Sequence, residues 1–187
     1  MLSGMERADA ARNRARILAA AAELFAAKGA PNVTMDEIAK AAGVGRGTLY
    51  RRYPDRASIA TALLDEHERD LQARLLGGDP PLGPGAPPAE RLAAFYAAMV
   101  DLLEAHAHLL LGIETGAPRF TTGAYGFWRV HVRALLAEAA LPDPDAAIDL
   151  LLAPLAPEVY IHQRTDRALT PDRVKAALTH LARTLLS

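Results

Sequence analysis

The chain has 187 residues, of which 51% are hydrophobic and 23% are charged, and its formal net charge is −1. This composition is typical of a globular protein with a sizeable core and excludes a disordered chain. Because cysteine is absent, disulfides, a thiolate nucleophile and cysteine-bearing metal sites are excluded, and a reducing compartment is favoured. No apolar run reaches the roughly 18 residues of a spanning helix and no secretion signal is visible, so we expect a cytoplasmic protein without membrane contact.

Charge is distributed unevenly along the chain. Residues 1–56 hold ten Lys and Arg against six acids, a balance of +4, whereas residues 57–187 hold eleven against sixteen, a balance of −5. Such a contrast indicates a module that binds a polyanion, attached to a body of a different kind.

Ala, Leu, Arg and Glu dominate the sequence, and apolar residues recur at helical spacing, so we predict an all-α fold. The first helix is expected over about 12–28, where an apolar stripe ends before Gly29 and Pro31. The second helix, about 34–42, has the clearest start in the chain, because Thr34 and Glu37 have the spacing of a capping box.

A glycine turn at Gly43 leads to a third short helix, about 46–52, which Pro54 prevents from continuing. Two short helices around a glycine turn are typical of a helix-turn-helix, here 33–52, whose second helix can enter a DNA major groove. The outward positions of that helix carry donors suited to phosphates and base edges, with a glycine that permits close approach. These positions are Arg46, Gly47, Thr48, Tyr50 and Arg51.

A fourth helix is expected over about 55–76, followed by a segment, 77–88, with four Gly and five Pro in twelve positions. This segment is either a linker or an ordered surface loop, and it is the clearest boundary in the sequence. Further helices are predicted at about 89–111, 124–140, 143–165 and 170–186, with an irregular or short helical piece at 112–123, giving about nine helices. Pro154 and Pro157 predict a kink or break within 143–165.

Residues 12–70 resemble the DNA-binding segment of TetR-type transcriptional regulators, above all from Val33 to Arg56. The resemblance implies a three-helix helix-turn-helix domain, 10–70, that binds palindromic operator DNA as a homodimer. It also implies a C-terminal helical bundle, 77–187, that dimerises and binds a small-molecule effector, whose binding moves the fourth helix and releases repression. Matched by position, it places these residues at or near DNA: Thr34, Arg46, Gly47, Thr48, Tyr50, Tyr53 and Arg56, with Arg51, Arg12 and Arg14 as additions.

Among these residues, we expect Arg46 to read bases and Arg51 and Arg56 to contact phosphates. Arg46→Ala should then relax operator preference, whereas Arg56→Ala should weaken binding to all sequences alike. Tyr50 and Tyr53 have an alternative interpretation as packing residues. Gly45 stands where relatives carry serine or threonine, so a capping and phosphate-binding hydroxyl is missing.

Inward polar and aromatic positions of the C-terminal helices are candidates to orient an effector, although each is also a plausible core residue. They are Tyr96, Met99, His106, Glu114, Arg119, Tyr125, Trp128 and His131. The apolar stripes of the last two predicted helices suit either an internal core or a two-fold interface, and the resemblance favours a homodimer through these helices.

Other chemistries are weaker. Gly43, Gly45 and Gly47 match neither the dinucleotide nor the Walker pattern, and His106 and His108 point to opposite sides of a helix, so no cofactor and no metal are predicted. The alternatives to a regulator are a small all-α enzyme using His106, His131 and Glu114, and a helical ligand-binding protein with a vestigial DNA module.

Overall fold

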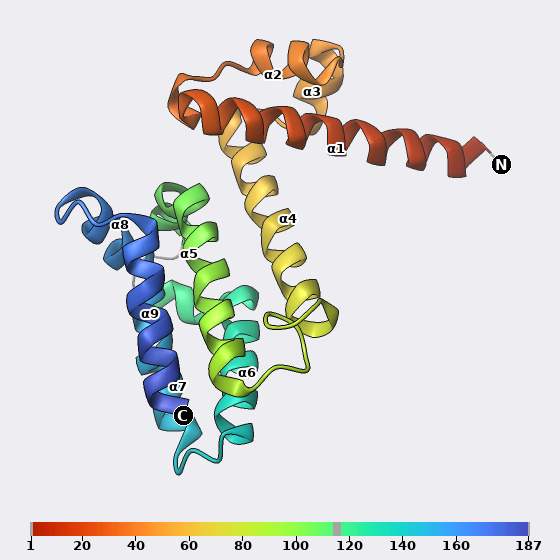
Figure 1. Ribbon diagram of the computed structural model, residues 1–187. Coiled ribbons are helices and arrows are strands. Elements are labelled where there is room, and N and C mark those ends of the chain that lie inside the picture. The colour runs from red at the N-terminus through yellow and green to blue at the C-terminus, as the bar shows by residue number, and fades with distance from the viewer. Residues whose placement is uncertain (1, 114–116, 187) are drawn as a thin grey trace. The chain divides into compact units, whose positions relative to one another are not determined.

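The computed structural model describes residues 2–113 and 117–186, and of their side chains all but those of residues 2–8, 108, 111–113, 117 and 118 (Figure 1). Within these ranges the regular structure consists of nine α-helices and three short 3₁₀ helices, with no strand. The prediction of an all-α fold with about nine helices is confirmed. Glu114, one of the effector candidates, lies outside the described residues.

The helices follow the chain in a simple order. Their bounds are α1 (Leu2–Lys28), η1 (Ala30–Asn32), α2 (Met35–Ala42), α3 (Arg46–Arg52), α4 (Arg56–Gly77), α5 (Pro88–Ile113), η2 (Ala117–Thr121), α6 (Gly123–Glu138), α7 (Pro144–Leu152), η3 (Ala153–Leu155), α8 (Pro157–Thr165) and α9 (Pro171–Leu186).

The chain forms two compact units, Met1–Glu66 and His67–Ser187, which divide inside α4. The first unit therefore contains α1, α2, α3 and the first half of α4. Its core is apolar and tightly closed, with Ile17, Ile38, Leu49 and Ile59 fully buried. Each of these four residues comes from a different helix, so the short helices α2 and α3 are held by packing more than by their own helix propensity.

Helix α1 is about ten residues longer at its start than the sequence predicts. The added turns contain helix-forming residues but no apolar stripe, so hydrophobic periodicity gives no signal there. As a consequence Arg12 and Arg14 lie on a helix, where Arg12 pairs with Asp9 one turn earlier.

The second unit is built around α5, whose inward side chains include the fully buried Phe95, Tyr96 and Leu103. Helix α5 packs against α6, α8 and α9. The Tyr96 hydroxyl donates to the carbonyl of Leu151 at 3.0 Å, which ties α5 to α7. The Gly- and Pro-rich segment is an ordered loop within this unit, and its Leu82 is buried.

The predicted interruption of the 143–165 pattern is confirmed. Helix α7 ends at Leu152, a 3₁₀ turn follows, and α8 starts at Pro157. The proline ring removes an N–H donor and clashes with the preceding turn, but it is tolerated at the first position of a helix, which is where Pro157 lies.

Candidate nucleic-acid interface and effector pocket

The start of α2 is fixed by the capping box that the sequence predicts. Thr34 Oγ1 accepts from the Glu37 N–H at 3.2 Å, and Glu37 Oε2 accepts from the Thr34 N–H at 2.8 Å. Lys28 Nζ donates to Glu37 at 2.6 Å, and this bond together with those from Thr34 lowers the pKa of Glu37 to about 2. The Thr34 hydroxyl also donates to Glu37 Oε2, so both its donor and its acceptor capacity are used in capping α2.

The turn between α2 and α3 depends on Gly43, which adopts φ 60 and ψ 39, the left-handed conformation that ends helices. Its N–H lies in reach of the carbonyls of Ala39 and Lys40, and its own carbonyl accepts from Arg16 Nη2 at 3.1 Å. An arginine of α1 thus anchors the turn that sets the angle between α2 and α3.

Helix α3 presents one buried side and one open side. Leu49 is fully buried, whereas Arg46, Tyr50 and Arg51 are exposed and Thr48 is half-buried. The N-cap, Gly45, makes no side-chain capping bond. The open side therefore carries two guanidinium groups, a phenol and a hydroxyl on seven residues, which is the arrangement of donors that a DNA groove requires.

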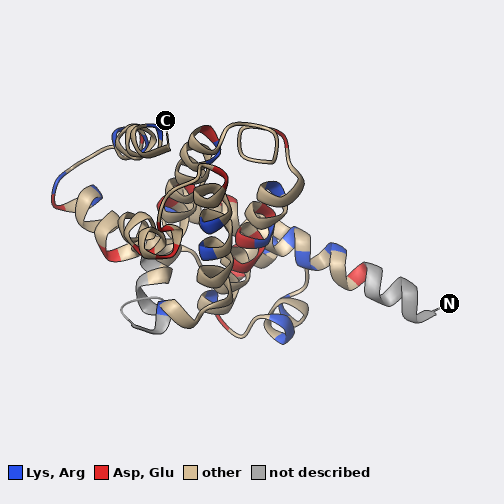
Figure 2. Cartoon of the chain, turned by 90° about the horizontal axis from the view of Figure 1, so that it is seen from below, with Lys and Arg blue, Asp and Glu red and all other residues tan. Residues whose placement is uncertain are grey.

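The two arginines of this open side differ in their partners. Arg46 Nε pairs with Asp36 Oδ1 of α2 at 2.8 Å, and this ion pair positions the side chain. A bidentate contact with guanine uses two adjacent nitrogens of the guanidinium. Arg51 is exposed and makes no ion pair or hydrogen bond with the other described residues. Basic residues also recur along α1 toward the N-terminus (Figure 2).

Three residues expected at DNA also make contacts inside the first unit. Arg56 Nη1 donates to the carbonyls of Ala30, Pro31 and Val33. These bonds connect the start of α4 to the segment before α2. Tyr53 is buried, which supports the packing interpretation for its ring.

Arg14 of α1 is the third such residue. Its guanidinium donates to the Tyr53 hydroxyl at 3.5 Å and to Glu66 at 3.4 Å. The sequence could not reveal these uses, because the partners lie 23 to 52 positions away along the chain.

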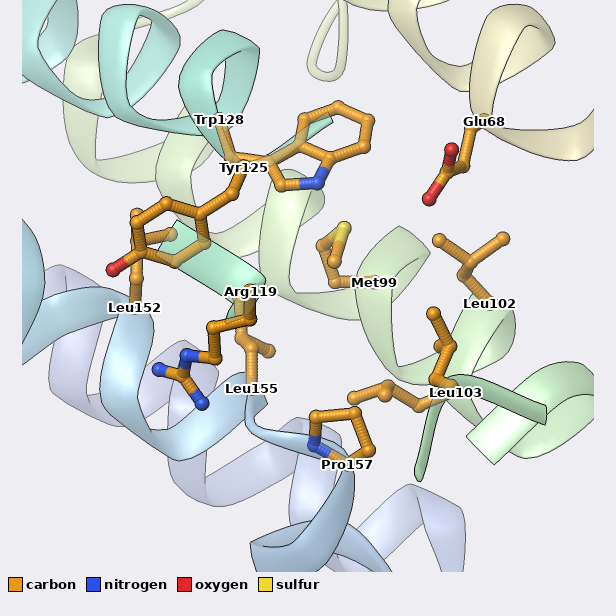
Figure 3. Close-up of a pocket in the computed structure, with 11 residues that line it drawn as sticks. Glu68, Met99, Leu102, Leu103, Arg119, Tyr125, Trp128, Leu152, Leu155 and Pro157 are labelled. Carbon is orange, nitrogen blue, oxygen red and sulfur yellow. The ribbon is translucent and has the colours of Figure 1, made fainter. Parts of the chain in front are cut away.

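A pocket in the second unit lies between α5, α6, η2, η3 and the start of α8, with Glu68 of α4 on its wall (Figure 3). The hollow measures about 450 Å³ when space open to solvent is included, whereas the cavity itself is only about 30 Å³. Most of the lining is apolar. The residues are Glu68, Met99, Leu102, Leu103, Leu110, Arg119, Tyr125, Trp128, Leu152, Leu155 and Pro157.

Four of the predicted effector residues, Met99, Arg119, Tyr125 and Trp128, line this pocket together. Three others are buried but do not line it: Tyr96, His106 and His131. The leucines, Pro157 and Glu68 were not predicted. Leucines at helical spacing do not by themselves distinguish a pocket from a core or an interface, and Glu68 lies on a helix that the sequence assigns to the other domain.

The two buried histidines are held neutral. His106 Nε2 lies 2.8 Å from His67 Nδ1, and burial, with the charge of His67 as a second cause, lowers the pKa of His106 to about 4. Burial lowers the pKa of His131 to about 4, with the charge of Arg91 as the second cause. Within the described residues, no group of three His, Cys, Asp or Glu could hold a metal ion.

Fold and sites together define a helical protein in which a helix-turn-helix unit is followed by a unit with an internal pocket. The family described as bacterial regulatory proteins, tetR family, matches residues 17–63, so the N-terminal unit is similar to the N-terminal domain of TetR-type regulators. The resemblance inferred from the sequence is confirmed. None of the described helices is both long and apolar enough to cross a bilayer.

The chain is similar in sequence to HTH-type transcriptional regulators and similar in fold to several solved structures. An uncharacterized HTH-type transcriptional regulator of Mycobacterium tuberculosis is 44% identical over 72 residues, which cover 38% of each chain. The chain thus aligns with little more than a third of this relative's length. A transcriptional regulator from Rhodococcus sp. Rha1 shares the fold with a TM-score of 0.67 and 19% identity, over 92% of this chain and 95% of that chain.

A further solved structure with this fold is FadR from Bacillus subtilis in complex with stearoyl-CoA. It has a TM-score of 0.61 and 18% identity, over 89% of this chain and 96% of that chain.

Proposed function

We propose that this protein is a transcriptional repressor that binds palindromic operator DNA as a homodimer and is released by a small-molecule effector. The observation that carries the proposal is the open side of α3, which displays Arg46, Thr48, Tyr50 and Arg51 on the TetR-type domain. A single short helix offers few contacts, so two copies on two half-sites supply affinity and symmetry together.

The effector would bind in the pocket of the second unit. Helix α4 is continuous from the first unit into the second, and its Glu68 lines the pocket. A ligand that displaces the second half of α4 would therefore change the DNA-binding equilibrium, provided that it prefers the non-binding state. A preference of about 1.4 kcal/mol corresponds to tenfold derepression. FadR with stearoyl-CoA supports the use of this fold for ligand binding.

The homodimer would form through α8 and α9. On these helices Val159, Leu181 and Leu185 remain between 37% and 39% exposed, although they belong to the apolar stripes. Part of the predicted stripe is internal, since Val174, Leu178 and Ala182 are buried. The partly exposed residues Val159, Leu181 and Leu185 would form the apolar part of the dimer interface.

Selection of bound duplexes from a random pool tests the proposal. The expected result is a palindrome whose half-sites are separated by about 34–36 Å or a multiple of it, bound with an affinity that falls steeply with salt. Arg46→Ala should relax the selected sequence, whereas Arg51→Gln should weaken all sequences alike and reduce the salt slope by about one. Exposed Arg173→Gln on α9 is the matched control and should change neither. Failure to enrich any sequence at low salt contradicts the proposal.

The enzyme alternative gains no support from the described residues. His106 and His131 do not line the pocket, and each is buried with a lowered pKa. A catalytic pair would need a shared, accessible space, and no observation favours one.

A further inference from the structure

The pocket of the second unit contains a buried cation. Arg119 is only 8% exposed, and its Nε is buried without a hydrogen-bond partner in the described part of the chain. Within the described residues, Arg119 forms an ion pair with Glu158, whose Oε1 lies 3.8 Å from Nη1, beyond hydrogen-bonding distance. A buried charge that lacks full hydrogen bonding is costly, so this guanidinium has unused capacity for an anion.

Two aromatic rings also lie against the Arg119 guanidinium. Its guanidinium carbon lies 5.0 Å from the centre of the Phe120 ring and 5.5 Å from that of Tyr125. The Tyr125 hydroxyl donates to Asp149 at 2.9 Å and also interacts with the Arg119 guanidinium. The rings stabilise the cation through their faces, while its Nε has no partner among the described residues and is left for a ligand.

The rest of the pocket is narrow and is lined mainly by apolar side chains. In Figure 3, Arg119 lies beside Tyr125 and Leu155 on one side, Glu68 lies on the opposite side, and Met99 is between them. Methionine and leucine side chains can move to widen a narrow pocket, and methionine does so most easily. A second charge at the far end of a ligand would be buried among apolar side chains, so a ligand with anions at both ends is disfavoured.

We propose that the effector is a monoanionic amphipath, a carboxylate with an unbranched apolar tail, whose carboxylate binds Arg119 and whose tail lies among Met99, Leu102, Leu103 and Trp128. The regulatory role of this ligand rests on the proposed function, whereas its binding to the pocket can be measured without DNA. Binding replaces the distant Glu158 contact by charge-assisted hydrogen bonds to the guanidinium.

Trp128 makes the test direct. It is the only tryptophan of the chain and lines the pocket, so intrinsic fluorescence of the full-length protein reports on occupancy. Titration with decanoate, below the concentration at which it forms micelles, should change the fluorescence saturably. Decanol, decylamine and decanedioate have the same chain length and should each bind at least about tenfold more weakly. Equal binding of decanoate and decanol, or no saturable change with decanoate, overturns the proposal.

The variant Arg119→Gln should weaken decanoate binding about ten- to hundredfold and leave decanol unchanged. Arg173→Gln is the control for loss of a positive charge and should bind decanoate as the parent does. If Arg119→Gln does not fold, as judged by circular dichroism, the order of preference in the unaltered protein decides. A variant that folds and binds decanoate normally also overturns the proposal.

Operator binding is measured separately by gel shift. DNA binding without decanoate binding removes this ligand class and leaves the repressor. Decanoate binding without any DNA binding removes the repressor and leaves the pocket assignment. Loss of DNA binding on adding decanoate, but not decanol, joins the two.

Discussion

At the scale of single residues, identical side chains in the first unit have different uses. Arg56 binds three backbone carbonyls and Arg14 joins α1 to Tyr53 and Glu66, whereas Arg51 stands open on α3. The spacing of the sequence predicts which arginines lie near the helix-turn-helix. It does not predict which of them bond to other parts of the domain, because only tertiary structure brings acceptors such as the Val33 carbonyl within reach.

Replacing Arg56 by Gln should therefore lower stability more than it changes DNA contacts. The loss of bonds to the carbonyls of Ala30, Pro31 and Val33 should reduce the free energy of unfolding by about 1 kcal/mol, since the side chain is exposed and its interactions are screened. Urea unfolding followed by circular dichroism measures this change, and Arg51→Gln is the matched control with little effect. An unchanged midpoint with a salt slope reduced by about one would support the phosphate contact predicted for Arg56 and contradict a structural role.

The buried histidines predict an acid-sensitive fold. Folding lowers the pKa of His106 and of His131 from 6.5 to about 4. Between pH 6.5 and 4 the unfolded chain binds protons that the folded chain does not. The free energy of unfolding is therefore highest above pH 6.5 and decreases as the pH falls toward 4. We expect each histidine to cost about 1 kcal/mol of stability at pH 5.5 relative to pH 7.5.

The measurement is urea unfolding at these two pH values. His131→Leu should reduce the pH dependence by about half, because the Nε2 of His131 is buried and has no partner among the described residues. Exposed His180→Leu is the control and should follow the parent curve. Equal pH dependence in the parent and His131→Leu would mean that protonation of His131 does not limit stability.

At the scale of elements, local signals predict α2 and α3 closely. The Thr34 cap, the Gly43 turn and Pro54 are all encoded within a few residues of the boundaries that they set. Where an element has no such signal the prediction fails, as at the start of α1, whose first turns lack an apolar stripe. Local signals predict where α3 begins and ends, but they do not predict which partner its exposed backbone contacts.

Gly47 separates folding from binding on α3. A Cβ built at Gly47 meets nothing within 4 Å, so Gly47→Ala should stabilise the protein by roughly 0.5–1 kcal/mol through helix propensity. If the backbone of Gly47 lies against DNA, the same methyl group should weaken DNA binding at least about tenfold. Thermal unfolding and gel shift give the two readings. Gly126→Ala on α6, equally open, should stabilise without any effect on DNA binding, and unaltered DNA affinity in Gly47→Ala removes Gly47 from the interface.

At the scale of the whole molecule, the sequence predicts a basic N-terminal module and a helical body. It does not predict how the body forms its pocket. Arg119, Trp128, Leu155 and Glu68 are far apart in the chain, and only packing of η2, α6, η3 and the second half of α4 brings them to one pocket. The division of the chain inside α4, rather than at the loop 78–87, has the same origin, since that loop packs within the second unit.

The exposed leucines of α9 predict the assembly. If α8 and α9 form the homodimer, the double substitution Leu181→Glu and Leu185→Glu places four like charges in a symmetric interface and should yield monomers. Neither leucine belongs to the buried set of α9, so the monomer should remain folded. Sedimentation equilibrium measures the mass, and gel shift should show that a palindrome binds the variant no better than a single half-site does.

Leu150→Glu on α7 provides the contrast, because Leu150 is even more exposed, at 74%, but lies off the proposed interface. It should leave both the mass and the preference for a palindrome unchanged. A dimer that survives the α9 substitutions and dissociates with Leu150→Glu would move the interface to α7. The two recognition helices would then be related through a different pair of surfaces, and the spacing of the selected half-sites would have to be explained from that axis.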